Sequence, residues 1–545
     1  MPKIRTYLDV VPESVKEDVS REWGERKKET MAFAKEHGIE IGVGESFNKV
    51  VTFSLSSGYY HMFSGITSIA DISALDEVKG KVSELIARMA HDEARRGCVP
   101  LMASNLCDWD SGYAKSVGAS RVLSDAIISA CAKDRIILTG GETANLGDQM
   151  KGKGMGWMFT LLSRYDGKMP GDENAYGGMD LDLQETFGFV ADRGRFGIVN
   201  CNGMPLLHVK NPSKFIITAD GSGSKSIVCD NIEKRTDIYD TLASAGDDPT
   251  RDGAFPVVAS IGVHAGSASG KAQMLGYMKD AARSCMLPLV GSVFDTAPDV
   301  YTYTLNGTVL SEVVDMAGLD GKGISPGLSL VILYERQRTN GITLQRRVLE
   351  EAFGKDWHGM KLDEAIGIIE GELGEGYASG KIHDQNTTLG EMVALPSTPY
   401  FRIDHRMPRS IMETVKLKIN VSSGGLVGKT RRCLEPMGIG AEYSNLFEAP
   451  DLVLLVQMSS RLRKSRGRIS DEVSYHTWGC GVGYVIGTSD PEGVVAHYTG
   501  NGIRAVVGGS IIAERGIRVS SKGLDSMDVG GTQVLRYRYT DRPLG

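Results

Sequence analysis

The chain has 545 residues, of which 41% are hydrophobic and 24% are charged, close to the average of globular domains. This length predicts about three domains with cores of ordinary size. The formal net charge of −7 argues against a dedicated nucleic-acid-binding protein, because it implies no long basic face.

Cysteine usage and hydropathy bear on the cellular compartment. The eight cysteines include no CxxC pair and fit no zinc-site spacing, so we expect reduced thiols in a cytoplasmic protein. The charged N-terminus has no apolar segment typical of a signal peptide. No apolar run approaches the ~20 residues of a membrane-spanning helix, so we expect no membrane partner.

Residues 1–40 are polar and predict a helical extension. From 41 to 165, segments of strand and helix periodicity alternate and predict a first α/β domain. The predicted elements are strand 50–57, helix 78–97, strand 99–106, helix 119–134 and strand 135–148. The last strand runs into a Gly-Gly turn that carries Glu142 and Thr143.

Residues 166–185 are acidic and rich in Gly and Pro, so they predict a linker. From 186 to 321 the alternating pattern starts again and predicts a second domain. Its elements are strand 215–218, helix 232–248, strand 255–263, helix 269–285 and strands 286–294 and 300–310. A third α/β domain is predicted from 322 to 545.

The first two domains share a motif that indicates an internal repeat. In the first, Asp92 is followed by Gly97 and then by Pro100. In the second, Asp248 is followed at the same spacing by Gly253 and Pro256. In both, the motif ends a predicted helix and opens a strand, so the sequence predicts a duplication.

A turn after strand 215–218 has the composition of a phosphate-binding loop. Gly221 and Gly223 allow the backbone to approach a phosphate closely. Asp220 offers oxygen to a hard cation such as Mg²⁺, and Lys225 offers a point charge to phosphate oxygens. By itself the signal is weak, because such carboxylates also cap turns and such lysines are often solvated.

These pieces together resemble the family of aminoimidazole ribonucleotide synthetase, or phosphoribosylformylglycinamidine cyclo-ligase. Asp220 to Lys225 (DGSGSK) is similar to the family's D-G-V-G-T-K, and Asp247-Asp248 to its Asn-Asp pair. Residues 140–144 read GGETA, as in the family. In the third domain the similar segments are TNGITL (339–344), SGG (423–425) and TWGCGVG (477–483).

The resemblance implies an α/β (α+β) architecture. Two tandem β-α domains would pair as an internal pseudo-dimer barrel, followed by one C-terminal α/β sandwich domain. GGETA precedes DGSGSK here, the reverse of the family's order, and each copy has lost the motif that the other keeps. The lost positions fall near 64–68 and 291–295. We therefore expect one ATP site composed of residues from both copies, in a monomer or a homodimer.

The implied reaction converts formylglycinamidine ribonucleotide to aminoimidazole ribonucleotide in purine biosynthesis, with ATP and Mg²⁺. The resemblance implies Lys225, Asp220 and Glu142 as catalytic residues and Asp220, Asp248 and Glu142 as metal ligands. The implied ATP-binding residues are Gly140, Gly141, Thr143, Gly221, Gly223, Ser224, Lys225 and Asp248. The implied substrate-binding residues are Arg338, Asn340, Gly341, Gly424, Gly425 and Lys429.

Several family positions are altered, which leaves alternatives open. Arg338 stands where the family has His, Gly479 where it has Asn, and Lys429 within its Glu-Asn position. The chain could use ATP on a different substrate, or bind nucleotide without catalysis. A P-loop at 423–430 is a further alternative, although Ser423 stands where that motif requires Gly.

Overall fold

A computed structural model of the chain describes residues 41–43, 51–146, 150, 153–167, 179–190, 194–201, 203–267, 270–296, 303–314, 321, 323–463 and 467–539. The expected helix within 1–40 and part of the expected linker lie outside these residues. The chain divides into two compact units, the first comprising 1–226 and 241–314 and the second 227–240 and 315–545. No helix in the described part has the length and apolarity needed to cross a membrane.

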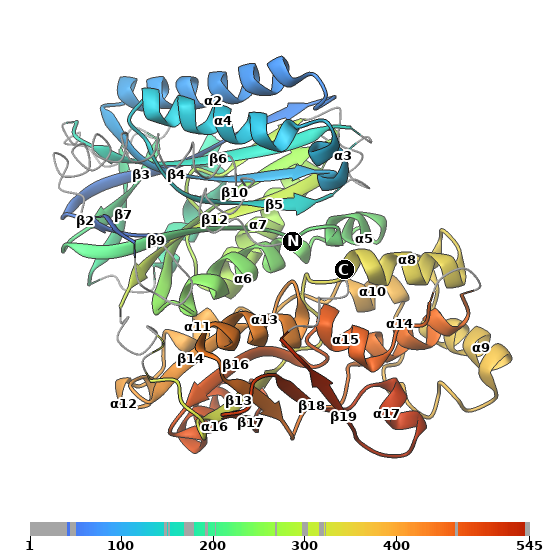
Figure 1. Ribbon diagram of the computed structural model, residues 1–545. Coiled ribbons are helices and arrows are strands. Elements are labelled where there is room, and N and C mark those ends of the chain that lie inside the picture. Colours follow the sequence, from blue (N-terminus) through green and yellow to red (C-terminus); the bar gives the residue numbers. More distant parts are fainter. Residues whose placement is uncertain are drawn as a thin grey trace. The chain divides into compact units, whose positions relative to one another are not determined.

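In the first unit, one six-stranded sheet has the order β5-β4-β6-β3-β8-β7 (Figure 1). Its strands are β3 (Gly58–Ile69), β4 (Cys98–Trp109), β5 (Ile137–Asn145), β6 (Met155–Tyr165), β7 (Phe196–Cys201) and β8 (Met204–Val209). The helices of this segment are α2 (Leu75–Arg95), α3 (Ser111–Ser116) and α4 (Ala119–Lys133). The apolar faces of α2 and α4 pack on the sheet through a buried cluster that includes Val82, Ile86, Leu123 and Trp157.

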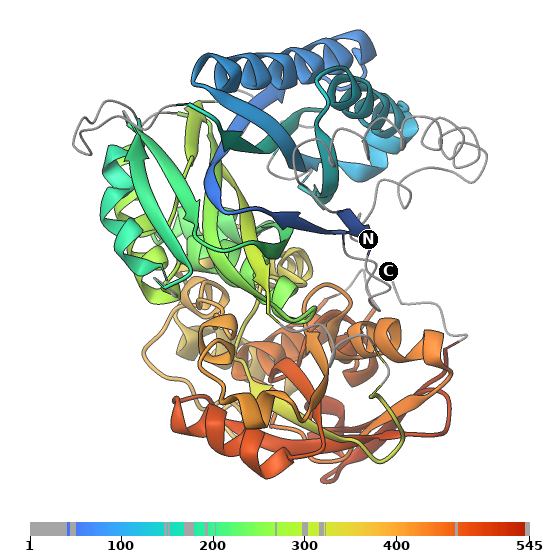
Figure 2. The ribbon, with the colours of Figure 1, turned by 90° about the vertical axis from the view of Figure 1, so that its left-hand side faces the viewer.

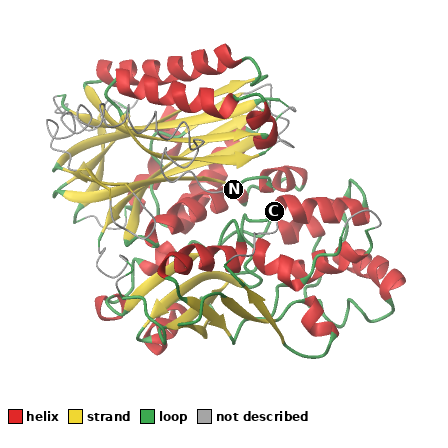
Figure 3. Ribbon diagram, in the orientation of Figure 1, coloured by secondary structure: helices red, strands yellow, loops and turns green. Residues whose placement is uncertain are grey.

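A second six-stranded sheet has the order β1-β2-β9-β12-β10-β11. Its strands are β1 (Ile41–Val43), β2 (Val51–Leu55), β9 (Ser213–Gly221), β10 (Ala254–Ala265), β11 (Val293–Thr296) and β12 (Tyr303–Val313). The helices of this segment are η2 (Met179–Phe189), α5 (Lys225–Asn231), α6 (Asp237–Thr250) and α7 (Lys271–Cys285). Thr218 on β9 donates a hydrogen bond to the Ala245 carbonyl of α6. Figure 3 shows the two sheets of this unit with helices on their outer faces.

The two sheets repeat one topology. The order β3-β6-β4-β5 in one corresponds to β9-β12-β10-β11 in the other, with a parallel last pair in each. Both copies have an irregular register just after the motif proline, at Pro100 and at Pro256. Gly97 and Gly253 both have positive φ, 79° and 73°. The predicted duplication is therefore present at the level of strand order and register.

The copies also exchange strands, which the sequence did not predict. β2, from the first copy's part of the chain, pairs with β9 of the second copy. β8, which precedes β9 in the chain, pairs with β3 of the first copy. Figure 2 shows this unit from the side. Each sheet thus takes two strands from the other half, β1 and β2 in one sheet and β7 and β8 in the other, so the predicted boundary between 165 and 186 does not separate the two sheets.

The sheets pack face to face through an apolar core and a polar centre. Met62, Met102 and Leu162 meet Ile217 and Val258 in the core. β5 contacts β9, and β3 contacts β10 and β11. The two copies are therefore in contact on both sides of their interface. No strand pairing joins the two sheets among the described residues, and the closed barrel stays a prediction.

The polar centre is a chain of buried hydroxyl groups. Thr160 Oγ1 lies 2.8 Å from both Ser64 Oγ and Thr308 Oγ1, and Ser64 Oγ lies 2.7 Å from Ser260 Oγ. Thr160 and Thr308 occupy equivalent positions, because they pair with Ser104 and Ser260 at the same offset in each sheet. The hydroxyl chain therefore joins the two copies.

The second unit contains a seven-stranded sheet of order β14-β16-β13-β17-β15-β18-β19. Its strands are β13 (Ser329–Tyr334), β14 (Val415–Asn420), β15 (Gly440–Tyr443), β16 (Val482–Thr488), β17 (Ala505–Ile512), β18 (Ile517–Ser521) and β19 (Gln533–Tyr537). The helices before β15 are α8 (Ile342–Phe353), η3 (Trp357–Gly359), α9 (Leu362–Leu373), α10 (Leu389–Val393), α11 (Phe401–Asp404), α12 (Arg409–Met412), α13 (Gly425–Leu434) and η4 (Glu435–Met437). The remaining helices are α14 (Asp451–Arg461), α15 (Asp471–Thr477), α16 (Pro491–Gly500) and α17 (Leu524–Asp528).

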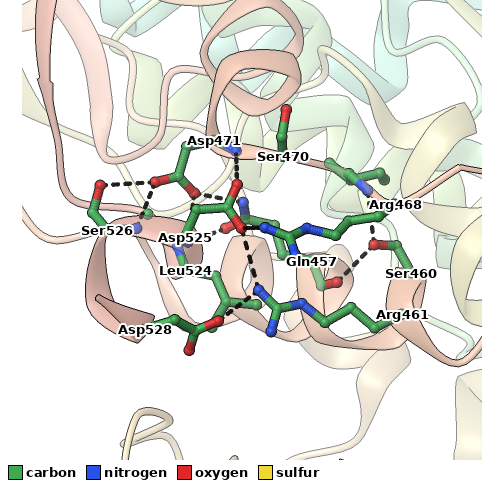
Figure 4. Close-up of polar contacts among 12 residues, drawn as sticks. Gln457, Ser460, Arg461, Arg468, Ser470, Asp471, Leu524, Asp525, Ser526 and Asp528 are labelled. Atoms are coloured by element: carbon green, nitrogen blue, oxygen red, sulfur yellow. Dashed lines mark hydrogen bonds and ion pairs between the residues drawn. The ribbon is translucent and has the colours of Figure 1, made fainter. Parts of the chain in front are cut away.

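A buried carboxylate joins three of these helices (Figure 4). Asp471, in the first turn of α15, accepts hydrogen bonds from Gln457 of α14 and from the backbone N–H groups of Asp525 and Ser526 in α17. Its Oδ2 also accepts from the Ser521 hydroxyl at 2.6 Å. Because these donors converge on one charged group, the network positions α17 against α14 and α15.

Candidate functional site

The DGSGSK segment forms a tight turn at the end of β9. Asp220 and Gly221 are the last residues of the strand, and α5 begins at Lys225. The Gly221 N–H donates to Asp220 Oδ1 at 2.8 Å, and the Ser222 N–H donates to the Leu305 carbonyl. A Cβ on Gly221 would lie 2.9 Å from that carbonyl oxygen, so glycine is required for this close approach.

The lysine of this turn is buried. Lys225 has no exposed surface and is among the largest fully buried side chains. Ser222 Oγ and Ser226 Oγ lie 2.8 Å apart around the start of α5. A buried ammonium group needs compensating polar partners, so the solvated-surface interpretation of Lys225 is wrong.

The GGETA segment lies on β5, the edge strand of the first copy. Glu142 is the parallel partner of Leu106, and Ala144 is the partner of Asp108. In the second copy, Val293 pairs with Gly262, which corresponds to Leu106. The register therefore aligns Glu142 with Val293, as the sequence predicted. The side chains of Glu142 and Thr143 lie outside the described residues.

A hydrogen bond between the two copies joins the neighbourhoods of both motifs. Asn306 Nδ2 donates to Asp108 Oδ2 at 2.8 Å, and both side chains are fully buried. Asp108 is the strand partner of Ala144, and Asn306 is the partner of Gly221. The strands β5 and β9 are also in contact. The fold therefore brings the two half-motifs of different copies to the same end of the unit.

Burial at this junction shifts the Asp108 carboxyl group toward its neutral form. Burial raises the pKa of Asp108 to about 7, although hydrogen bonds from Asn306 and Thr304 act to lower it. Oδ1 of Asp108 and Oδ1 of Asn306 are buried and accept no hydrogen bond from the residues that the structure describes. Two such acceptors beside the phosphate-loop strand suit a polar or cationic ligand group.

The equivalent position in the second copy carries a histidine. His264 lies eleven residues after Gly253, as Asp108 does after Gly97. Its Nε2 lies 3.1 Å from the Thr67 carbonyl oxygen, and burial lowers its pKa to about 4. Met158 stands where the other end has Asn306, in an apolar cluster with Ile66 and Leu106. The two ends of the interface have therefore diverged, one polar and one largely apolar.

Asp248 is placed apart from the DGSGSK turn. Thr241 of α6 packs on Gly307, which is the strand partner of Asp220. Asp248 lies two helical turns further along α6. Two helical turns correspond to about 10 Å along the axis. Asp248 is buried, with Oδ1 3.7 Å from Arg251. Of the three predicted metal ligands, the partly exposed Asp220 fits Mg²⁺ better than Asp248, and the metal-binding roles stay predictions.

In the second unit, two of the predicted substrate segments converge. Asn340 donates from Nδ2 to the Thr477 carbonyl at 2.7 Å, and Gly341, which caps the N-terminus of α8, lies against Trp478. Together with Arg338 and Gly479, these segments line a cavity of about 20 Å³, enough for roughly one water molecule. The sequence therefore identified segments that meet in space.

The two cationic substrate candidates lie inside this unit. Arg338 is 4% exposed, with Nη1 3.4 Å from Glu335 and its guanidinium 5.4 Å from the centre of the Tyr400 ring. Burial raises the pKa of Glu335, against the opposing effect of Arg338. Lys429 is also buried, in the second turn of α13. Both side chains are therefore buried rather than exposed.

The P-loop alternative is wrong. Gly424 caps α13, which begins at Gly425, four residues before Lys429, so the lysine follows the helix start. β14, which precedes this turn, is an edge strand that pairs antiparallel with β16. A P-loop instead places its glycine-rich turn and lysine around the phosphates at the start of the helix.

Sequence reasoning missed Asp108 and Asn306. The strand prediction ended at Leu106, whereas β4 continues to Trp109 and carries Asp108 inward. Asn306 falls within the predicted strand 300–310, but the sequence predicts no functional role for it. An ionisable residue that continues a buried strand is the signal that could have identified this position.

Comparison with known proteins gives distant relatives. No known family profile matches the chain. It is 24% identical over 230 residues to a phosphoribosylformylglycinamidine cyclo-ligase of Cupriavidus pinatubonensis, covering 40% of this chain and 55% of that protein. It is 25% identical over 202 residues to that of Sorangium cellulosum, covering 36% and 50%. The matches thus span about half the length of these relatives.

The solved structures that match this chain include a thiamine-monophosphate kinase of Stenotrophomonas maltophilia, with a TM-score of 0.41 and 13% identity. That match covers 63% of this chain and 96% of the kinase. A PurL of Thermotoga maritima complexed with FGAR gives a TM-score of 0.38 and 13% identity, covering 66% and 50%.

Proposed function

We propose that this chain, a distant relative of the phosphoribosylformylglycinamidine cyclo-ligase family, is an ATP-dependent ligase that forms a C–N bond. The observation that supports this most is the Asn306–Asp108 hydrogen bond. The strand partner of Asn306 is Gly221 of DGSGSK, and that of Asp108 is Ala144 of GGETA. A composite nucleotide site requires these segments of different copies at one place.

The proposed reaction closes the imidazole ring of formylglycinamidine ribonucleotide. The amide oxygen attacks the γ-phosphorus of ATP, and ADP leaves. The internal amine nitrogen then attacks the activated carbon, the C–O bond breaks, phosphate leaves and the amine proton passes to solvent. Such phosphoryl transfer depends mainly on positioned phosphates and positive charge.

Each residue's proposed role follows from its place. The N–H groups that follow Ser222 in this turn would contact phosphate oxygens, and the buried Lys225 would supply positive charge. Asp220 and Glu142 would hold Mg²⁺, which supplies charge neutralisation when bound to the triphosphate. Asp108 and Asn306 would keep β4 and β12 together and hold their own polar atoms toward the site.

A diverged substrate is the second candidate. Arg338 and Lys429 stand at altered family positions, and both side chains are buried. Arg338 is close to Glu335 and Tyr400, which accounts for its charge without a substrate phosphate. This arrangement favours an ATP-using relative that acts on another substrate, or a nucleotide-binding relative without catalysis.

The test is an ATP-dependent cyclisation assay with formylglycinamidine ribonucleotide, together with calorimetric ATP binding. Wild type would be compared with Glu142→Ala and Lys225→Ala, and with Lys214→Ala on the exposed part of β9 as the matched control. Product from wild type and the control but from neither site variant, with circular dichroism unchanged, supports the proposal. If wild type binds ATP but makes no product, the second candidate is favoured. If wild type does not bind ATP, both candidate functions are contradicted.

A further inference from the structure

We propose that the first copy contains a buried Zn²⁺ site formed by His61, Glu93 and Cys98. One ligand atom from each of these residues lies within 4.8 Å of the others. All three are at most 3% exposed. They come from three different elements, since His61 is on β3, Glu93 is on α2 and Cys98 begins β4.

The cluster offers the donor types that zinc prefers. His61 Nδ1 lies 2.9 and 3.0 Å from the two carboxylate oxygens of Glu93. Ligand atoms on one tetrahedral Zn²⁺ lie about 3 to 4 Å apart, so small side-chain rotations would close the set. A thiolate and a carboxylate together balance the charge of the ion. Three protein ligands leave a fourth position for water.

Without metal, the neighbouring groups shift the pKa values of two of these residues. Burial acts to raise the pKa of Glu93, but His61, Ser163 and Arg96 together hold it below its usual value. Burial and the negative Glu93 raise the pKa of the Cys98 thiol. A bound Zn²⁺ would take the thiolate form of Cys98 and a ring nitrogen of His61 that carries no proton.

The fold itself does not require ionisable residues at these positions. By the spacing from Gly97 and Gly253, Glu93 and Cys98 correspond to Pro249 and Ala254 of the second copy. His61 pairs with Ser163, and Ile216 occupies the corresponding place opposite Ser311. The second copy builds the same strand order with Ile216, Pro249 and Ala254 at the three positions. A buried ion pair often stabilises a fold no better than apolar residues of similar size, so a ligand role accounts for the difference.

Two neighbouring groups define the alternatives. Arg96 Nη1 lies 3.4 Å from Glu93 Oε1, so without metal the cluster is a buried ion-pair network. Met204 Sδ lies 3.9 Å from Cys98 Sγ, and Cys201 packs in the same group. A site built around Cys201 would be a different, softer site that favours Cu⁺.

The test uses the full-length protein, stripped of metal with a chelator and then titrated with Zn²⁺ or Co²⁺. We expect one Zn²⁺ per chain by elemental analysis, a thiolate-to-cobalt charge-transfer band, and a higher Tm with Zn²⁺. Affinity should fall as pH decreases, because protons compete for the ligands. Cys98→Ala should lower the affinity at least about tenfold and remove the band.

The variant and its controls keep the result interpretable. Cys98→Ala introduces the residue that the second copy carries at Ala254, so it should fold. Cys107→Ala removes another buried thiol of β4 and should bind like wild type, as should Cys201→Ala. Absence of Zn²⁺ binding by folded wild type, unchanged binding by Cys98→Ala, or loss of binding in Cys201→Ala would each overturn the assignment.

Discussion

Asn306 donates a hydrogen bond to Asp108 across the interface between the two copies, over a distance of 2.8 Å. The two residues are far apart in the chain but lie beside Gly221 and Ala144, respectively, in their sheets. The contact therefore provides a physical link between the two half-motifs, and it can be tested without knowing the substrate.

Asp108→Asn should change the pH dependence of stability. Burial raises the pKa of Asp108 to about 7 from the usual value of 3.8, so between these values the folded chain holds a proton that the unfolded chain has lost. Stability therefore falls as pH rises through this window, by up to about 4 kcal/mol.

The asparagine variant lacks this titration. Urea unfolding followed by tryptophan fluorescence should show it to be more stable than wild type at pH 8 by about 2–4 kcal/mol, with little difference near pH 4. Asp125→Asn on the exposed face of α4 is the control, and its difference from wild type should be within about 0.5 kcal/mol at both values. If the free energy of unfolding changed equally with pH in wild type and in Asp108→Asn, the prediction would be contradicted.

Gly221→Ala should weaken ATP binding. The added Cβ would lie 2.9 Å from the Leu305 carbonyl oxygen and 3.0 Å from Asn306 Oδ1, so the turn must shift. We expect an affinity at least about tenfold lower by calorimetry, because displaced phosphate contacts lose alignment.

Gly276→Ala is the matched control for this change. It lies in α7, where no heavy atom approaches the new Cβ within 4 Å, and should stabilise the chain by about 0.5–1 kcal/mol with unchanged ATP affinity. Wild-type affinity in Gly221→Ala would remove this turn from the proposed site.

Thr160→Val should weaken the contact between the copies. The threonine hydroxyl lies 2.8 Å from those of Ser64 and Thr308, and valine leaves both buried groups with one partner fewer. The free energy of unfolding should fall by about 1–3 kcal/mol in urea titration. Thr296→Val, at an exposed residue of β11, should cost less than about 0.5 kcal/mol. If Thr160→Val left the free energy of unfolding unchanged, the hydroxyl chain would contribute no net stability.

Asp471→Asn should destabilise the second unit. The carboxylate accepts five hydrogen bonds, and an amide nitrogen in place of one oxygen faces donors that it cannot satisfy (Figure 4). We expect a loss of about 3 kcal/mol, measured by thermal and urea unfolding.

The comparison for this network is Asp528→Asn. Asp528 is 2.7 Å from Arg461 but is 25% exposed, so its loss should cost less than about 1 kcal/mol. If the two variants were equally stable, burial would not be the reason for the strength of the Asp471 network.

Sequence patterns alone determined a large part of this molecule. The spacing of Asp, Gly and Pro identified the duplication, because helix ends and the turn before β4 and β10 constrain residue types locally. The same pattern aligned Glu142 with Val293, which the strand register confirms. Glycine-rich turns such as that at Gly221 are similarly readable, since the backbone geometry itself demands the residue.

Only the tertiary structure decided which strands and side chains meet. Nothing local to β2 or β8 distinguishes pairing within a copy from exchange between copies, because either sheet satisfies the same backbone hydrogen bonds. Asp108 meets Asn306, and His61 meets Glu93 and Cys98, through packing of elements that are distant in the chain. The cysteine spacing predicted no zinc site, since that reasoning considers neighbours in sequence, whereas ligand distances are set by how β3, α2 and β4 pack together.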